Sequence, residues 1–271
     1  MTTVSTSTSL LSADAIDELY RTRVLVNDDP AYLKRYDDFD FEAEFGADGL
    51  RRSEFPRLII ILEFKRLIAA HAISSQRLLM LNGGESMDPE AHHLPHRDVE
   101  YADYETDPLR HDLHRLQLTS GPFDFVLMSQ TLEHLYNPHL ALGNLRSVMS
   151  DDGWLWTSVP TVSRQHQLPV HFQTGFTPIG LACLLEQCGY DIVEVGQWGN
   201  TKYISHLFDL QILPTIHDLR RGSLRARGYG HILRAARRLS PRNFLSAGLH
   251  NDFEHPAQTW ALARKPPTAG A

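Results

Sequence analysis

The sequence has few of the features that would place a protein outside the ordinary globular class. Cysteine is scarce, because Cys183 and Cys188 are the only two in 271 residues and both fall in an apolar helical pattern. A disulfide-stabilised scaffold is therefore not expected, and a reducing, cytoplasmic location is the better expectation. Long apolar runs are also missing. The most apolar segment, LIIILEF at 58–64, contains Glu63 and is much shorter than the ~20 residues of a membrane-spanning helix.

An excess of positive charge is lacking as well. The net charge of −7 argues against nucleic acid or a membrane surface as a partner. The N-terminus, MTTVSTSTSL, has neither the basic nor the apolar part of a signal peptide, so residues 1–10 are expected to be a disordered tail, with a second tail at 266–271. An apolar content of 42% and a charged content of 22% are typical of a soluble globular protein.

Three regions differ in composition. Residues 11–75 have helical spacing of apolar residues, which predicts a helical N-terminal cap. Residues 76–265 alternate strand-like and helix-like segments, an order typical of an open parallel α/β sheet with ligands at the carboxyl ends of its strands. Within them, residues 200–250 are rich in arginine and are expected to form a basic helical insertion or lid before the last strand, TWALARK at 259–265.

The periodicity of the middle region predicts individual elements. FDFVLMS at 123–129 is typical of a buried strand, and PHLALGNLRSVM at 138–149 of a helix that begins at Pro138. Thr177 precedes a predicted helix, IGLACLLEQCG, that Gly189 closes. Further strands are predicted for RLLMLN, for VEYADYE at 99–105, for GWLWTSVP after a turn at Asp152-Gly153, and for YDIVEVGQW.

Two collinear stretches carry a family resemblance. "FDFVLMSQTLEHLYNPHLALGNLRSVMSDDGWLWTSVP" and "FTPIGLACLLEQCGYDIVEVG" resemble the class I S-adenosylmethionine-dependent methyltransferases, and most of all a type 11-like branch found in sugar and natural-product pathways. The resemblance covers roughly residues 76–198 and the last strand. It implies an α/β fold with a Rossmann-like seven-stranded sheet, helices on both faces, and S-adenosylmethionine as cofactor.

The cofactor site that this resemblance implies has a degenerate glycine loop. Its residues would be Asn82, Gly83, Gly84 and Glu85, with Ser86 standing where the family has its last glycine. Glu85 could supply the carboxylate that is missing from the strand before the loop. The alternative is a strand-to-helix turn that needs glycine only for close packing, since glycine motifs also match by chance.

The resemblance also implies contacts to the rest of the cofactor. An acid at the end of the second strand would accept hydrogen bonds from the ribose, and alternation places Asp103 and Glu105 on one face there. Asp103 is favoured by position, and a solvated edge carboxylate is the alternative for each. The other implied contacts are the adenine-contacting pair Asp112 and Leu113, and Ser129 and Gln130 after the fourth strand.

Three histidines are candidates for the reaction itself, because imidazole suits the removal of a proton from a hydroxyl near neutral pH. His171 and His166 follow the fifth strand, where the resemblance places the substrate loop, and His171 is preferred. A loop-stabilising role beside Phe172 is the alternative for His171. His134 in "LEH" either organises the loop over the reacting centre or bonds to backbone at a helix start.

Metal binding is not expected. The sequence has fifteen histidines, but neither "HHLPH" nor "HDLH" has the HxxxH or CxxC spacing of common zinc sites. We therefore interpret these histidines as surface residues; they are His92, His93, His96, His111 and His114.

The arginine-rich segment 220–242 has three interpretations: a solvated helical face, a wall that recognises an anionic group, or a partner of the acidic N-terminal region. Aromatic residues interleave poorly with these arginines, so nucleic acid is not expected. A homodimer is compatible with the sequence. The leading functional hypothesis is S-adenosylmethionine-dependent methyl transfer to a small polar acceptor, with oxygen favoured over nitrogen.

Two other function classes stay open. The degenerate loop fits a protein that kept the fold and lost methyl transfer, and that now serves as a binding or regulatory protein or as a non-methylating cyclase or isomerase. A nicotinamide-dependent oxidoreductase is the weaker alternative, because such a domain needs a GxGxxG motif that the sequence lacks.

Overall fold

The computed structural model describes residues 10–25, 30–36, 38–52, 55–81, 88–118, 120–163, 165–201, 203–204, 228, 251 and 254–267. The glycine loop, residues 1–9 of the N-terminal tail and all of the arginine-rich segment except Gly228 lie outside the described residues. The chain divides into two compact units. One comprises Met1–Leu25, Ile59–Gln197 and Gln258–Ala271, and the other comprises Val26–Leu58 and Trp198–Ala257.

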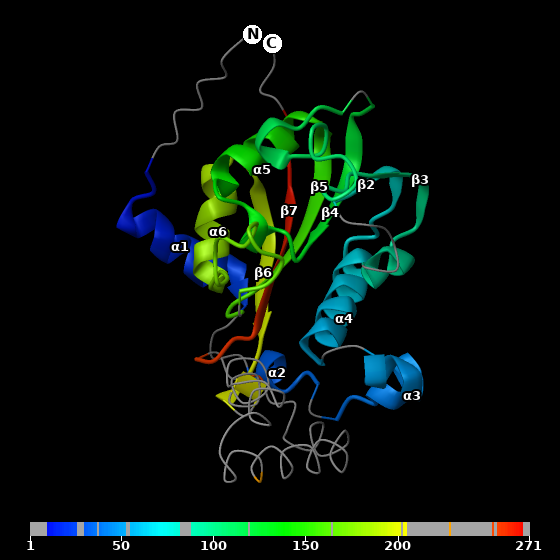
Figure 1. Ribbon diagram of the computed structural model, residues 1–271. Coiled ribbons are helices and arrows are strands. Elements are labelled where there is room, and N and C mark those ends of the chain that lie inside the picture. Colours follow the sequence, from blue (N-terminus) through cyan, green and yellow to red (C-terminus); the bar gives the residue numbers. More distant parts are fainter. Residues whose placement is uncertain are drawn as a thin grey trace. The chain divides into compact units, whose positions relative to one another are not determined.

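Helices and strands alternate along most of the chain (Figure 1). The 3-10 turns are η1 (Pro89–His93), η2 (Leu113–Arg115) and η3 (Leu132–His134). The helices are α1 (Ala13–Arg23), α2 (Pro30–Leu33), α3 (Phe41–Arg52), α4 (Phe55–Ala70), α5 (Pro138–Ser147) and α6 (Pro178–Gln187). The strands are β1 (Val24–Leu25), β2 (Ser75–Met80), β3 (His96–Tyr101), β4 (Phe123–Ser129), β5 (Met149–Pro160), β6 (Asp191–Trp198) and β7 (Gln258–Arg264).

One sheet runs through the first unit, in the order β1-β6-β7-β5-β4-β2-β3. The pairs β2–β3, β2–β4, β4–β5 and β1–β6 are parallel, whereas β7 is antiparallel to β5. The Rossmann-like α/β fold is therefore confirmed, and β7 is the antiparallel exception in the otherwise parallel pairings. Seven strands within the methyltransferase-like region are not confirmed, because six come from that region and the seventh is the two-residue β1.

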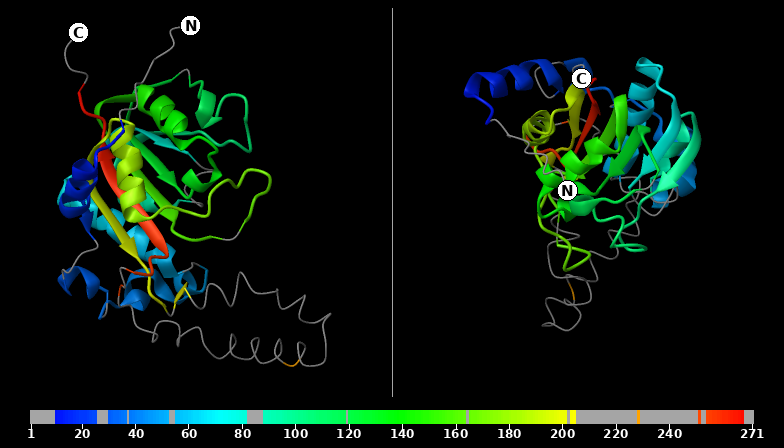
Figure 2. Two further views of the ribbon diagram at one scale, coloured as in Figure 1. Left: turned by 90° about the vertical axis from the view of Figure 1, so that its left-hand side faces the viewer. Right: turned by 90° about the horizontal axis from the view of Figure 1, so that it is seen from above.

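Helices cover both faces of this sheet, with α5 and α6 on one side and α4 on the other (Figures 1 and 2). The apolar residues of α4 are buried from Leu58 to Leu62, and Phe64, Leu67 and Ile68 are buried after them, as expected for a helix that contributes to the core. Phe64 packs edge-on against Phe125 of β4 and Trp156 of β5, with ring centroids 6.0 Å and 5.1 Å apart. None of the helices in the described part of the chain is long and apolar enough to span a membrane.

The ends of the helices follow local chemistry. The Thr177 hydroxyl accepts a hydrogen bond from the Gly180 N–H and caps α6, whose first residue is Pro178. Gly189 follows the helix with a φ of 76°, which a residue with a Cβ rarely adopts. The Asn137 side chain caps α5 in the same way. The predicted starts of both helices, and the predicted stop of α6, are confirmed.

The predicted turn at Asp152-Gly153 is wrong, because both residues lie inside β5. Asp152 has a φ of 62° and the register against β4 shifts between Phe123 and Phe125, so the segment is an irregularity within a continuous strand. Long-range pairing holds it there. The Asp152 N–H donates to Lys265 at 2.9 Å, and the Lys265 N–H donates to Gly153 at 2.8 Å.

Candidate active site

The site is built at the carboxyl edge of the parallel strands, where the turn η3 directly follows β4. Nδ1 of His134, the last residue of η3, lies 2.7 Å from the carbonyl oxygen of Val170. Because a carbonyl oxygen only accepts hydrogen bonds, Nδ1 carries the proton and Nε2 presents a lone pair. The hydrogen bond to backbone expected for His134 is thus observed, although its partner comes from a distant loop and not from the turn itself.

The loop after β5 is fastened to η3 by backbone hydrogen bonds. The N–H groups of Phe172 and Gln173 donate to the carbonyl of Glu133, at 2.9 Å and 3.2 Å. At the end of the loop, Gly175 has a φ of 145° and lies so close to the backbone of Pro160 that a Cβ there would overlap it. These contacts fix where the segment around His171 lies.

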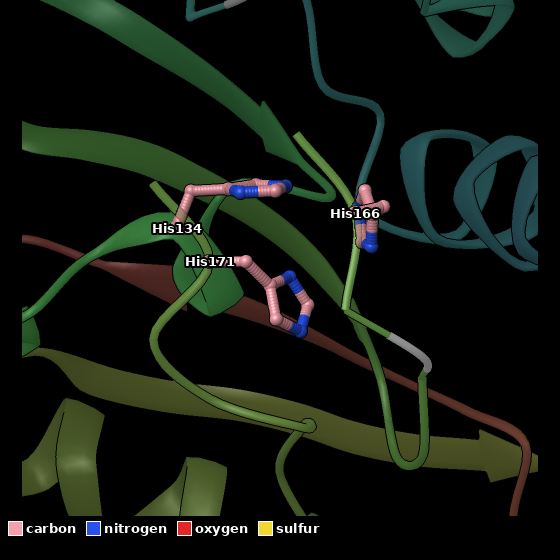
Figure 3. Close-up of side chains that lie close together, drawn as sticks. All are labelled: His134, His166 and His171. Carbon is pink, nitrogen blue, oxygen red and sulfur yellow. The ribbon is translucent and has the colours of Figure 1, made fainter. Parts of the chain in front are cut away.

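The three predicted catalytic histidines come together in this loop and turn (Figure 3). The ring centroids of His166 and His171 are 4.5 Å apart, and those of His134 lie 4.8 Å from His166 and 5.5 Å from His171. One ring nitrogen from each histidine lies within 4.8 Å of the others. In Figure 3 the rings of His134 and His171 extend from one side toward that of His166. We call His134, His166 and His171 the histidine cluster.

Burial favours the uncharged form of two members of the cluster, His134 and His171. Desolvation lowers the pKa of His171, and the neighbouring His166 and His134 lower it further. Desolvation also lowers the pKa of His134, against the opposing effect of its hydrogen bond to Val170, and His166 adds to the lowering. The His171 side chain is only 8% exposed, and neither of its ring nitrogens has a hydrogen-bond partner among the described residues. A neutral imidazole with a lone pair, as in His134 and His171, can accept a proton or bind a metal ion.

The acids predicted for the second strand lie outside it. β3 ends at Tyr101, so the alternation argument that put Asp103 and Glu105 on one strand face is wrong. Asp103 is half-buried in the turn that follows, and its Oδ1 accepts the N–H of Glu105 at 2.9 Å. Glu105 is exposed. An ionised carboxylate accepts about four hydrogen bonds, so Asp103 can still accept ribose hydroxyls, as the implied cofactor requires.

The carboxylate of Asp112 is bound by residues that are close to it in the sequence. It caps η2 through the N–H of His114, accepts a second bond from Nδ1 of His114 at 2.8 Å, and pairs with Arg115 at 3.1 Å. Burial opposes its charge, but these donors lower the pKa of Asp112. Leu113, the other half of the predicted adenine pair, is buried. Asp112 therefore has less capacity left than Asp103 for a cofactor contact.

His114 is not a surface residue, contrary to the expectation for the "HDLH" motif. Its side chain is 8% exposed and its ring stacks on Tyr136 with centroids 3.8 Å apart. Nε2 accepts the N–H of Asn137, so both ring nitrogens are used structurally. In the part of the chain that the structure describes, neither "HHLPH" nor "HDLH" gathers three metal-ligating groups.

The residues after β4 have partners that the sequence did not reveal. The hydroxyl of Ser129 donates to the buried Glu90 at 3.2 Å. The side chain of Gln130 pairs with the amide of Gln258 from β7, and Gln130 itself adopts a φ of 52°. Glu90 follows the undescribed glycine loop, and only its position just after that loop could have drawn attention to it. Nothing in the sequence pairs Gln130 with Gln258.

One family model matches the middle of the chain. Residues 68–195 match the family model described as "Methyltransferase domain", slightly less than half of the chain. This match supports, for residues 68–195, the methyltransferase resemblance that the sequence motifs predicted, and the Rossmann-like sheet is the fold that this resemblance implies. A search of curated proteins finds no match.

Several solved structures are similar to the chain. N-methyltransferase NodS from Bradyrhizobium japonicum, in complex with S-adenosyl-L-homocysteine, is 16% identical, with 93% of this chain and 98% of that chain covered and a TM-score of 0.42. An O-methyltransferase from a trans-AT PKS multienzyme of Brevibacillus brevis is 11% identical, with 91% and 82% covered and a TM-score of 0.44. The [4+2]-cyclase SpnF is 15% identical, with 79% and 83% covered and a TM-score of 0.39.

Proposed function

We propose that the protein transfers a methyl group from S-adenosylmethionine to an oxygen atom of a small polar acceptor bound beside the histidine cluster. The observation that carries this proposal is the convergence of three imidazoles at the carboxyl edge of the parallel strands, with the pKa of His134 and of His171 lowered by burial. Ligands of open α/β sheets bind at this edge. The cofactor supplies an electrophilic methyl group on a sulfonium ion.

The cluster favours oxygen over nitrogen as the methylated atom. A hydroxyl must lose its proton as its oxygen bonds to the methyl carbon, whereas a neutral amine attacks without a base. His171 is our first candidate for the base, because its nitrogens have no other partner among the described residues. In this step the acceptor oxygen bonds to carbon, the carbon–sulfur bond breaks with its electron pair left on sulfur, and the hydroxyl proton passes to the imidazole.

The cofactor contacts belong to the same proposal. Asp103 would hold the ribose, and Leu113 would face the adenine. Ser129 and Gln130 line the edge of the sheet, and the loop Asn82–Glu85 would hold the methionine part. An anionic group on the acceptor, recognised by arginines of residues 220–242, is a further part of this proposal, as are a cytoplasmic location and a homodimer.

The test begins with calorimetric titration of the full-length chain with S-adenosylmethionine and S-adenosylhomocysteine, followed by measurement of S-adenosylhomocysteine release with hydroxylated acceptors. His171→Gln should lower turnover by on the order of 100-fold or more and leave cofactor affinity unchanged. His139→Gln is the matched control, since His139 is exposed on α5 and pairs with Gln187.

Two results would decide against the proposal. No cofactor binding in the titration would exclude methyl transfer. If Asn82→Gly with Ser86→Gly then raised cofactor affinity sharply, the alternative of a fold that has lost methyl transfer would be supported instead.

A further inference from the structure

The histidine cluster contains more imidazoles than proton removal requires. One base suffices for a hydroxyl, yet His134 from η3 and His166 and His171 from the loop after β5 bring three nitrogens within 4.8 Å of one another (Figure 3). His166 and His171 are five residues apart, whereas His134 precedes His166 by more than thirty residues, so the tertiary fold has to bring them together. A set of three converging nitrogens is what a metal ion needs.

His134 and His171 each present a ring nitrogen that can bind a ligand. The hydrogen bond from Nδ1 of His134 to the Val170 carbonyl fixes the tautomer and leaves Nε2 with its lone pair, an arrangement usual for metal-binding histidines. His171 is more than nine-tenths buried and has no hydrogen-bond partner among the described residues. Buried polar atoms in native proteins nearly always have a partner, so these nitrogens point to a bound species.

We propose that His134, His166 and His171 bind one divalent transition-metal ion of the zinc type. Zinc–nitrogen bonds of about 2.0–2.1 Å at tetrahedral angles place ligand nitrogens about 3.4 Å apart. The nitrogens, which lie within 4.8 Å of one another, would have to move closer by up to about 1.4 Å to reach that spacing. The buried carboxyl group of Glu133 lies beside this site, with its Oε1 4.0 Å from Nε2 of His134.

The ligand set defines the kind of ion and of site. Imidazole suits zinc, iron, nickel and copper, whereas magnesium and calcium prefer oxygen ligands. Three histidines leave one position of a tetrahedral ion open, as in catalytic and not structural zinc sites. The binding itself does not depend on methyl transfer.

The consequence for the reaction does rest on the proposed function. A hydroxyl bound in the open position would have a lowered pKa and could lose its proton to solvent without a protein base. In the metal-loaded protein the imidazoles would then be ligands, and proton removal by His171 would belong to the metal-free protein.

The experiment uses the full-length chain after chelator treatment and dialysis. Titration with Co²⁺ should give visible absorption bands of a tetrahedral site that saturate at one ion per chain and that Zn²⁺ abolishes. Elemental analysis after Zn²⁺ loading and dialysis should give the same ratio. Single variants His134→Gln, His166→Gln and His171→Gln should each weaken Co²⁺ binding by on the order of 100-fold or more. The control His139→Gln should bind as the parent chain does.

Thermal unfolding distinguishes a variant that has lost metal binding from a variant that does not fold. Zn²⁺ should raise the melting temperature of the parent chain and of His139→Gln, because an ion that binds only the native state stabilises it. It should not raise that of a folded cluster variant. The proposal is overturned if the parent chain retains no Zn²⁺ after dialysis, or if His139→Gln weakens Co²⁺ binding as much as the cluster variants do.

The same preparations separate this inference from the proposed function. Metal binding without cofactor binding would leave the metal site standing and remove methyl transfer. Methyl transfer by a chain that binds no metal would do the opposite, and would support His171 as the base.

Discussion

Replacing Arg66 by methionine should destabilise the protein by breaking a partly buried ion network between α4 and β6. The Arg66 guanidinium donates to Oε2 of Glu63 through Nε and Nη2, at 2.9 Å and 2.8 Å, and also pairs with Glu194 of β6. Burial opposes the charge, yet the two carboxylates raise the pKa of Arg66, so the guanidinium stays ionised. Methionine keeps the length and most of the packing of the side chain and removes the charge.

The size of the effect follows from the burial of the partners. The side chain of Glu63 is 0% exposed and that of Glu194 is 15% exposed, so both carboxylates would be left in poor contact with water. Breaking a buried pair in this way costs about 3–5 kcal/mol. The side chain of Arg66 is 31% exposed, and water can partly replace it. We therefore expect the free energy of unfolding to fall by about 3 kcal/mol, at the lower end of that range.

Urea unfolding followed by circular dichroism measures this change. Lys65→Met, which alters the exposed neighbour on the same helix, should stay within about 0.5 kcal/mol of the parent chain. Adding Glu63→Gln to Arg66→Met should recover at least about 1 kcal/mol, because a neutral amide costs less to bury than a carboxylate that has lost its guanidinium. A loss below about 1 kcal/mol, or no recovery in the double variant, would refute the reasoning.

Three further predictions concern packing, the site loop and a thiol. Gly196→Ala should lower the free energy of unfolding by about 1–3 kcal/mol in urea melts, because the added Cβ would overlap the ring of Trp260. The control Gly143→Ala adds a Cβ in open space on α5 and should raise that free energy slightly, so equal effects of the two variants would contradict the prediction. Gly175→Ala should destabilise by about 1–3 kcal/mol and abolish Co²⁺ binding, because the loop carrying His171 must move, and intact binding would argue against that coupling. Burial raises the pKa of Cys188 to about 11, so few thiolates form at pH 8. Iodoacetamide should label Cys188 roughly 20-fold more slowly than a free cysteine, by mass spectrometry; labelling as fast as in urea would disprove the shift.

Elements with strong local signals could be predicted from the sequence. FDFVLMS became β4 at the predicted bounds because its apolar run Phe125–Met128 is buried on both faces. α6 begins and ends at its predicted caps for reasons contained in Thr177, Pro178 and Gly189. The strand predicted at 99–105 is several residues away from the observed bounds of β3. His96–Tyr101 is a half-exposed strand without that apolar pattern.

Other features depended on contacts far away in the sequence. Asp152-Gly153 has the residues of a turn, but pairing with Lys265 keeps it in β5. The histidines could be chosen as candidates one by one, since each lies in a segment that follows a strand end. Their convergence could not be predicted, because it depends on backbone bonds from Phe172 and Gln173 to one carbonyl in η3.

Those backbone bonds make the histidine cluster a single cooperative unit. The carbonyl of Glu133 holds the loop in place, and the loop in turn supplies the Val170 carbonyl that sets the tautomer of His134. If the loop moved away, His166 and His171 would leave, and Nδ1 of His134 would lose the bond that frees Nε2. The site should therefore be present or absent as a whole. Conditions that loosen the loop should abolish proton removal and metal binding together, whichever of the two the cluster performs.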